Sequence, residues 1–220
     1  MKLQAEPSFT KRPKSKGEAV SVCLWSSDKW SNDKHWVPFE RFMLSHPTMD
    51  VLVYHERGHP LAQRCSELGA RTFEVTSNET GFHRHFWRYI GGSEGYERVW
   101  FRGMDGIKTP DRELRLMNAV REARCDFLIW QLRESLCMGK LAASADGGMS
   151  LLHWLRNNHW IGKSNVWDCD ERTLDKWVRV GDARIGIAVD SPQVWQMGWF
   201  LERLLEGNHT IILKDRDDRR

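Results

Sequence analysis

Long hydrophobic runs are missing from this sequence. Its 220 residues have a mean hydropathy of −0.59, and no stretch approaches the roughly 20 consecutive apolar residues that a membrane-spanning helix needs. The basic beginning of the chain, which includes Lys11, Arg12 and Lys14, is not followed by an apolar stretch, and this argues against a secretory signal. We therefore expect a cytoplasmic protein with no membrane partner.

Paired cysteines and a large excess of charge are missing as well. The 5 cysteines are odd in number and form no Cys-x-x-Cys pair, which argues against a disulfide framework or a thiolate zinc site. The formal net charge is only +3, a value that is compatible with a nucleic-acid partner but does not indicate one. Tryptophan is abundant, with 12 residues, and its rings either fill a core or stack on a sugar or base.

Short apolar runs alternate with stretches of helical periodicity. Strands are predicted over 19–25, 50–55, 72–75, 99–102, 126–132, 185–189 and 210–213. Helices are predicted over 37–45, 60–68, 83–90, 110–124, 171–178 and 194–205, with residues 145–152 as a loop that runs into a helix. This alternation is typical of a single-domain α/β fold with a mostly parallel sheet flanked by helices. We expect a flexible basic segment over 1–17, the domain over 18–213 and a charged tail over 214–220.

The strand at 99–102 is followed by a segment that suits phosphate chemistry. Ligands of open α/β sheets bind beyond the carboxyl ends of the strands, where Arg102 and Asp105 stand here. A carboxylate at that place can hold Mn²⁺ or Mg²⁺ against the diphosphate of a nucleotide sugar, and an arginine can add charge-assisted hydrogen bonds. The alternative is a plain turn at a strand end with an exposed Asp105.

The order of several short motifs carries a resemblance. Phe86-Trp87-Arg88-Tyr89 is followed by a strand that ends in Arg102-Gly103-Met104-Asp105-Gly106. This resembles bacterial and viral GT-A-fold glycosyltransferase-like proteins, in which a Phe-Trp-Arg-Phe-like run precedes a strand ending in Arg-Asp-x-Asp-Ser. Similar pairs follow in the same order at Arg112-Glu113, Ala119-Val120, Arg133-Glu134, Gly147-Gly148, Asp170-Glu171 and Asp190-Ser191.

The resemblance covers roughly residues 19–195 and implies a GT-A-like fold, a nucleotide-sugar donor (in the first place a UDP-sugar) and a divalent metal. The donor-binding residues that it implies are Trp87, Arg88, Arg102, Asp105, Gly147 and Gly148. The metal ligands that it implies are Asp105 and Asp190.

The chain also departs from the pattern of this family. Gly103 replaces the first aspartate of the motif, and Val189 replaces a histidine before Asp190. Both departures weaken the metal site. Donor phosphates would then depend on basic residues alone, or the fold would bind a ligand without catalysing a reaction.

Three carboxylates are candidates for the general base that an inverting transfer requires. Asp170 and Glu171 open a predicted helix, where an aspartate also commonly serves as the N-cap. Asp146 precedes two glycines, where it equally fits a structural turn. The sequence leaves the catalytic and the structural interpretation open at each of them.

The leading hypothesis is a glycosyltransferase that moves a sugar from a nucleoside-diphosphate sugar to an acceptor hydroxyl. The acceptor is a glycan or a hydroxymethylated DNA base, as in viral DNA modification. The basic start of the chain and its many arginines and tryptophans favour DNA, because enzymes that reach a base need basic and aromatic surface. The competing hypothesis is a non-catalytic module that binds a nucleotide, glycan or nucleic acid on a degenerate GT-A fold. The sequence carries no signal for the oligomeric state.

Overall fold

The structure, a computed structural model, describes residues 17–25, 33–45, 49–76, 81–104, 107, 127–132, 135–157, 173, 185–190 and 209–214. The strands are β1 (Glu18–Leu24), β2 (Asp50–His55), β3 (Arg71–Glu74), β4 (Arg98–Arg102), β5 (Phe127–Leu132), β6 (Ser135–Ser144), β7 (Ile185–Asp190) and β8 (His209–Lys214). The helices are α2 (Asp33–Ser45), α3 (Pro60–Glu67), the 3-10 helix η1 (Gly81–Ser93) and α5 (Ala145–Asn157). For β5, β7, β8 and residues 135–141 of β6, the description covers the backbone.

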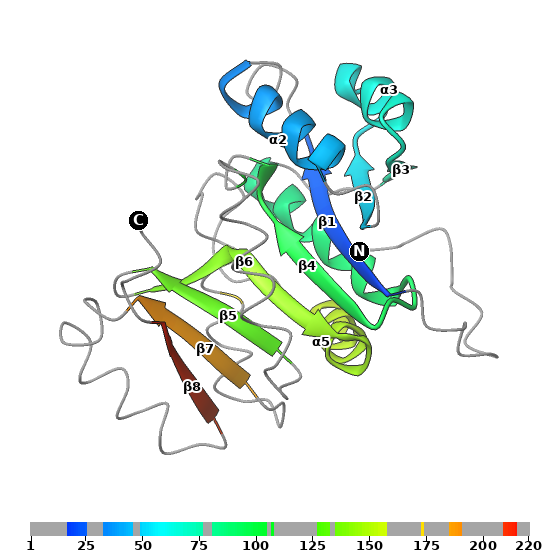
Figure 1. Cartoon of the computed structure of the whole chain (residues 1–220). Coiled ribbons are helices and arrows are strands. Elements are labelled where there is room, and N and C mark those ends of the chain that lie inside the picture. Colours follow the sequence, from blue (N-terminus) through cyan, green and yellow to red (C-terminus); the bar gives the residue numbers. More distant parts are fainter. Residues whose placement is uncertain are drawn as a thin grey trace.

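The described strands form one sheet in the order β3-β2-β1-β4-β6-β5-β7-β8 (Figure 1). β1 is parallel to β2 and β4, β2 is parallel to β3, and β7 is parallel to both β5 and β8. Among the described strands, only β6 runs antiparallel, and it does so to both of its neighbours. The predicted α/β fold, a mostly parallel sheet flanked by helices, is confirmed.

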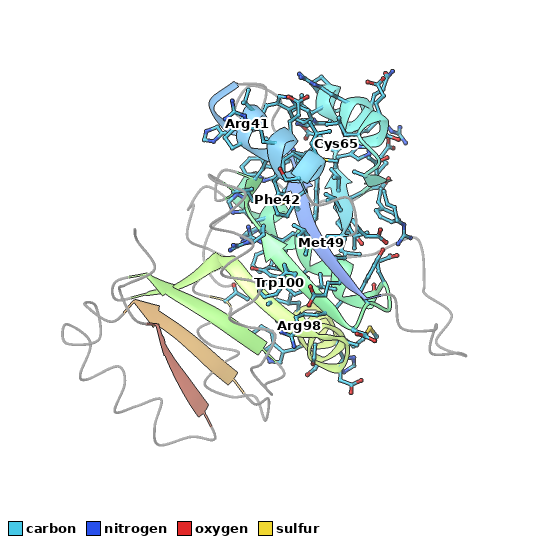
Figure 2. All side chains as sticks on the ribbon, in the orientation of Figure 1. Arg41, Phe42, Met49, Cys65, Arg98 and Trp100 are labelled. Carbon is cyan, nitrogen blue, oxygen red and sulfur yellow. The ribbon has the colours of Figure 1, made fainter. Side chains whose placement is uncertain are left out.

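Alternate residues of β1 face opposite sides of the sheet, as the twofold repeat of a strand requires. Val20, Val22 and Leu24 join the main apolar cluster, which α2 and α3 complete. The members that these two helices contribute are Trp36, Phe39, Phe42, Met43, Leu61 and Cys65. Figure 2 labels Phe42 and Cys65 on α2 and α3, and Trp100 of β4 on the same cluster. The apolar face of both helices is thus the reason that they cover this side.

The other face of the sheet is covered by η1 at unusually close range. The Ser21 hydroxyl donates a hydrogen bond to the carbonyl oxygen of Arg88 (2.6 Å). A Cβ atom added to Gly91 would lie 2.5 Å from the Ser21 Oγ, so only glycine fits there. The same holds where η1 meets α5, because a Cβ atom on Gly92 would lie 2.8 Å from the carbonyl oxygen of Gly148.

Strand β6 is the element that the sequence analysis did not predict. It contains Gly139, Ala142 and Ala143, which have little intrinsic preference for a strand. The strand is instead fixed by its neighbours, because β4 and β5 offer it hydrogen-bonding partners on both edges.

The loop predicted at the start of 145–152 is instead the first turn of α5. The Gly147 N–H donates to the Ser144 Oγ (3.1 Å), so Ser144 acts as the N-cap of the helix. Asp146 lies in this first turn, where the helix dipole favours a negative charge. These local contacts offset the low helix propensity of the two glycines.

Several predicted segments cannot be compared with the structure. The helices over 110–124 and 194–205 lie outside the described residues, as do 1–16 and 215–220. Within 171–178 the structure describes Thr173, which is helical and fully buried. Among the described helices, none is long and apolar enough to cross a membrane.

Candidate functional site

The carboxyl ends of β1 and β4 lie side by side in the parallel part of the sheet. The chain leaves β1 toward β2 on one side, whereas β4 pairs with β1 on the other side. Such a reversal of strand order is a topological switch point, which is where open α/β sheets bind their ligands. The candidate site therefore lies at the carboxyl edge of β1, β2 and β4.

Arg102 is the last residue of β4 and lies at this edge. Its side chain is 4% exposed, and the alternation along the strand puts it on the same face as Trp100, which packs under α2. A guanidinium carries five N–H donors in a fixed planar fork that matches a phosphate. The predicted donor-binding role of Arg102 is therefore compatible with its place at the switch point.

Asp105, the centre of the predicted donor site, lies outside the described residues. Met104 directly before it and Ile107 two residues after it are described, and both are held in the core: Met104 is 1% exposed and Ile107 is 2% exposed. The Ile107 N–H donates to the carbonyl oxygen of Met104 (3.4 Å). Met104 and Ile107 thus anchor the chain in the core shortly after β4.

The amino-terminal part of η1 reaches the same edge. The rings of Trp25, the residue after β1, and His85 have their centroids 5.2 Å apart. The Arg84 guanidinium donates to the Glu56 carboxylate (2.5 Å), and the Glu56 N–H donates to the carbonyl oxygen of Leu24 (3.1 Å). An aromatic pair and an ion pair therefore join β1, the turn after β2 and η1 at the switch point.

None of these contacts was evident from the sequence. Glu56 and Arg84 are 28 residues apart, and neither stands in a motif. Trp25 follows a strand, which is the single sequence signal that marks it as a residue of the carboxyl edge.

Trp87 and Arg88, both predicted to bind the donor, lie in the interior, 2% and 3% exposed. The Arg88 Nη2 donates to the Tyr89 hydroxyl (3.2 Å). The Arg84 guanidinium lies 5.6 Å from the centre of the Trp87 ring. Phe86 is buried beside them, so this motif builds the interface between η1 and the sheet.

His59 lies in the turn between β2 and α3 and is 5% exposed. It is the N-cap of α3, and its Nδ1 accepts the Leu61 N–H (3.3 Å). Burial lowers the pKa of His59 below the usual 6.5, which Glu56 opposes and His55 reinforces. No functional motif marks this residue in the sequence, although Pro60 directly after it is a known sign of a helix start.

Asp146, Gly147 and Gly148 lie at the opposite edge of the sheet from Arg102. In the β4–β6 pair, Arg98 is opposite Ser144 and Arg102 is opposite Lys140, so α5 starts beside the amino end of β4. Figure 2 shows Arg98 beside α5. The length of β4 separates the two edges by about 13 Å. The structure therefore does not bring the start of α5 together with the switch point.

Asp190 ends β7, and its backbone lies at the same edge of the sheet as Arg102. β5 and β7 run in the same direction as β4, because both β4 and β5 are antiparallel to β6. Three strand spacings, about 14 Å, separate β4 from β7 across the sheet. The predicted bases Asp170 and Glu171 lie outside the described residues, so their roles stay predictions.

Among the described residues, no group of three or more His, Cys, Asp and Glu side chains is arranged to hold a metal ion. Magnesium in nucleotide enzymes is commonly held by one or two carboxylates and completes its shell with substrate phosphates and water. The structure does not test the predicted pair of ligands, because Asp105 and the side chain of Asp190 lie outside the described residues. Asp146, in the first turn of α5, lies at the opposite edge of the sheet from the ends of β4 and β7.

Comparisons with known proteins concern the fold. No protein-family model and no curated protein matches the chain. A fragment of S. aureus TarS, residues 1–349, resembles it with a TM-score of 0.50 at 12% identity, over 74% of this chain and 55% of the fragment. The chain has a GT-A-like fold. The synthetase of CMP-2-keto-3-deoxy-manno-octonic acid, solved with CTP, resembles it with a TM-score of 0.51 at 10% identity, over 86% of this chain and 98% of that one.

The two similar proteins were solved with different nucleotides. The TarS fragment was also solved with UDP and with UDP-GlcNAc, whereas the synthetase holds CTP. This chain spans about half the length of the TarS fragment. At such low identities the similarity shows the GT-A-like fold, which nucleotidyl- and glycosyltransferases share.

Proposed function

We propose that this chain is a glycosyltransferase that moves a sugar from a nucleoside-diphosphate sugar to an acceptor hydroxyl. The observation that carries the proposal is the place where the chain leaves β4, over residues 102–107. The chain does so at the topological switch point, with Met104 and Ile107 anchored in the core on either side of Asp105. A GT-A-like fold places donor phosphates at such an edge, and the TarS fragment forms complexes with UDP and UDP-GlcNAc.

The chain's own groups would act as follows. Arg102 would donate hydrogen bonds to the donor diphosphate and stabilise the charge that develops on it as the glycosidic bond breaks. The acceptor oxygen attacks the anomeric carbon, and its proton passes to a carboxylate base. We propose Asp170 or Glu171 for that base in preference to Asp146, because α5 begins at the opposite edge of the sheet.

A divalent ion belongs to the proposal as a further element of the donor site. Asp105 and Asp190 would hold Mn²⁺ or Mg²⁺. The ion would supply positive charge to the leaving diphosphate. Asp105 follows β4 and Asp190 is the last residue of β7, and these two strands end at the same edge of the sheet, which is the support for this pairing.

The acceptor class rests on the composition of the chain. A glycan and a hydroxymethylated DNA base both present the hydroxyl that the reaction needs. A basic start and many tryptophans favour DNA. Binding to duplex DNA that weakens steeply with salt would support this acceptor, because phosphate contacts release counterions. A response that is independent of salt would remove it.

The test of the reaction is turnover of UDP-sugars with Mn²⁺ by the full chain and by Asp105→Ala. We expect release of UDP by the full chain and a loss on the order of 100-fold in the variant. Donor binding without release of UDP would instead favour the non-catalytic module, which Gly103 and Val189 also favour. Release of pyrophosphate from CTP would indicate a nucleotidyltransferase. Failure to bind any nucleotide would overturn the proposal.

A further inference from the structure

The start of α3 depends on a ring nitrogen that must be unprotonated. Pro60 occupies the first helical position and has no N–H, so Leu61 provides the first free amide of the helix. That amide donates to the Nδ1 of His59 (3.3 Å). A nitrogen that accepts a hydrogen bond carries a lone pair, so His59 is neutral in this structure, with its proton on Nε2.

The surroundings of His59 disfavour its protonated form. The ring is 5% exposed, and its Nε2 has no hydrogen-bond partner among the described residues. The start of a helix carries a partial positive charge that repels a cation. Of the titratable groups around it, His55 at the end of β2 acts against protonation, and Glu56 in the same turn acts in its favour.

Glu56 connects this cap to the candidate site. The His59 N–H donates to the carbonyl oxygen of Glu56 (3.2 Å). The carboxylate of Glu56 also accepts a hydrogen bond from Arg84 in the amino-terminal part of η1 (2.5 Å). The 56–59 turn therefore carries both the N-cap of α3, at His59, and the carboxylate of the ion pair at the switch point, at Glu56.

We propose that His59 is a proton-sensitive cap, which holds the 56–59 turn and the start of α3 when neutral and releases them when protonated. On protonation, Nδ1 gains a hydrogen and meets the Leu61 N–H donor to donor, so the hydrogen bond is lost. Glu56 then loses the turn that positions it against Arg84. Mild acid thus loosens the carboxyl edge of β1 and β2. This device does not depend on which reaction the site performs.

The test compares three forms of the full chain: the natural sequence, His59→Asn and His55→Asn. Asparagine is a strong N-cap residue with no proton to gain, so His59→Asn keeps the cap and removes its pH dependence. Amide hydrogen exchange, expressed as protection factors, is measured for α3 at about pH 7.5 and about pH 5, on either side of the ordinary histidine pKa. Amides of β1 serve as the internal reference.

We expect α3 protection in the natural sequence to fall about five- to tenfold in acid, the equivalent of one lost cap. The protection of α3 should be the same at both pH values in His59→Asn. In His55→Asn it should fall in acid by as much as in the natural sequence. An equal fall in His59→Asn would overturn the proposal, as would constant protection in the natural sequence. An NMR titration of the His59 ring adds a second measurement, and a pKa at or above 6.5 would also overturn it.

Discussion

Gly92 of η1 and Gly148 of α5 lie backbone against backbone, with no room for a side chain between them. A Cβ atom on Gly92 would lie 2.8 Å from the carbonyl oxygen of Gly148 and 2.9 Å from its Cα. Backbone atoms cannot turn aside as the tip of a long side chain can. Two elements that are far apart in the sequence are therefore packed together through a pair of glycines.

Gly92→Ala should destabilise the protein by about 1–3 kcal/mol, the usual cost of forcing an extra methyl group into a packed interior. Urea denaturation measures the change in the free energy of unfolding. Ser150→Ala, at an exposed position of α5, is the control and should change stability little. Equal stability of Gly92→Ala and the natural sequence would show that the two elements can move apart at no cost.

Stability should decline at alkaline pH because three buried groups resist ionisation in the fold. Burial raises the pKa of Cys65 from 9.0 to about 12. Burial, followed by the hydrogen bond to Asp50, raises the pKa of Tyr96 from 10.0 to about 12. Burial also raises the pKa of Tyr54. The unfolded chain loses these protons first, so the stability present below pH 9 falls as the pH rises toward 12.

Urea denaturation at a series of pH values measures this decline. Tyr96→Phe removes one of the ionising groups and should give a shallower slope above pH 10 than the natural sequence. Cys65→Ala should do the same from pH 9 upward. Slopes that are equal in all three forms would assign the alkaline loss to other groups.

The Arg84–Glu56 pair should contribute a measurable coupling energy. Its side chains are 29% and 27% exposed, which reduces screening by water, and we expect about 0.5–1 kcal/mol from a double-mutant cycle with Arg84→Met and Glu56→Gln. The Arg57–Glu74 pair is the matched control, because its side chains are 83% and 42% exposed. A cycle there should give a coupling near zero. Equal coupling in both cycles would contradict the role of burial.

Arg102 and Arg98 lie at the two ends of β4, which makes them a matched pair for the donor-binding proposal. Arg102→Met should weaken UDP binding by about 10- to 100-fold, the effect of one charge-assisted hydrogen bond. The affinity of Arg102→Lys for UDP should lie between those of the natural sequence and Arg102→Met, because lysine keeps the charge but not the planar fork. Arg98→Met should leave the affinity unchanged. Calorimetric titration with UDP measures these affinities. It is carried out on variants whose circular dichroism matches that of the natural sequence.

The parallel part of the sheet could be predicted because its strands carry their own signal. Val20, Val22 and Leu24 repeat with period two, and β2 is a continuous apolar run. β6 carries no such signal, since Ala142 and Ala143 gain their place from pairing with β4 rather than from propensity. Local sequence predicts a strand only where the strand would be favoured on its own.

The candidate site could be placed at the end of β4 for a general reason, the position of switch points in α/β sheets. The contacts around it could not be predicted. Glu56 meets Arg84 only through the path of the fold. His59 caps α3 although histidine is not among the preferred N-cap residues, and burial of its ring follows from packing that no local pattern records.

The position of β6 has a consequence for synthesis of the chain. Once the first half of the chain has left the ribosome, β4 can pair with β1 on one side. Its other neighbour, β6, is synthesised only after β5. Until then the hydrogen-bonding edge of β4, including Trp100, is open, and open edges recruit foreign strands. A chain cut short before residue 135 should consequently aggregate, and the nascent protein should need a chaperone at that stage of translation.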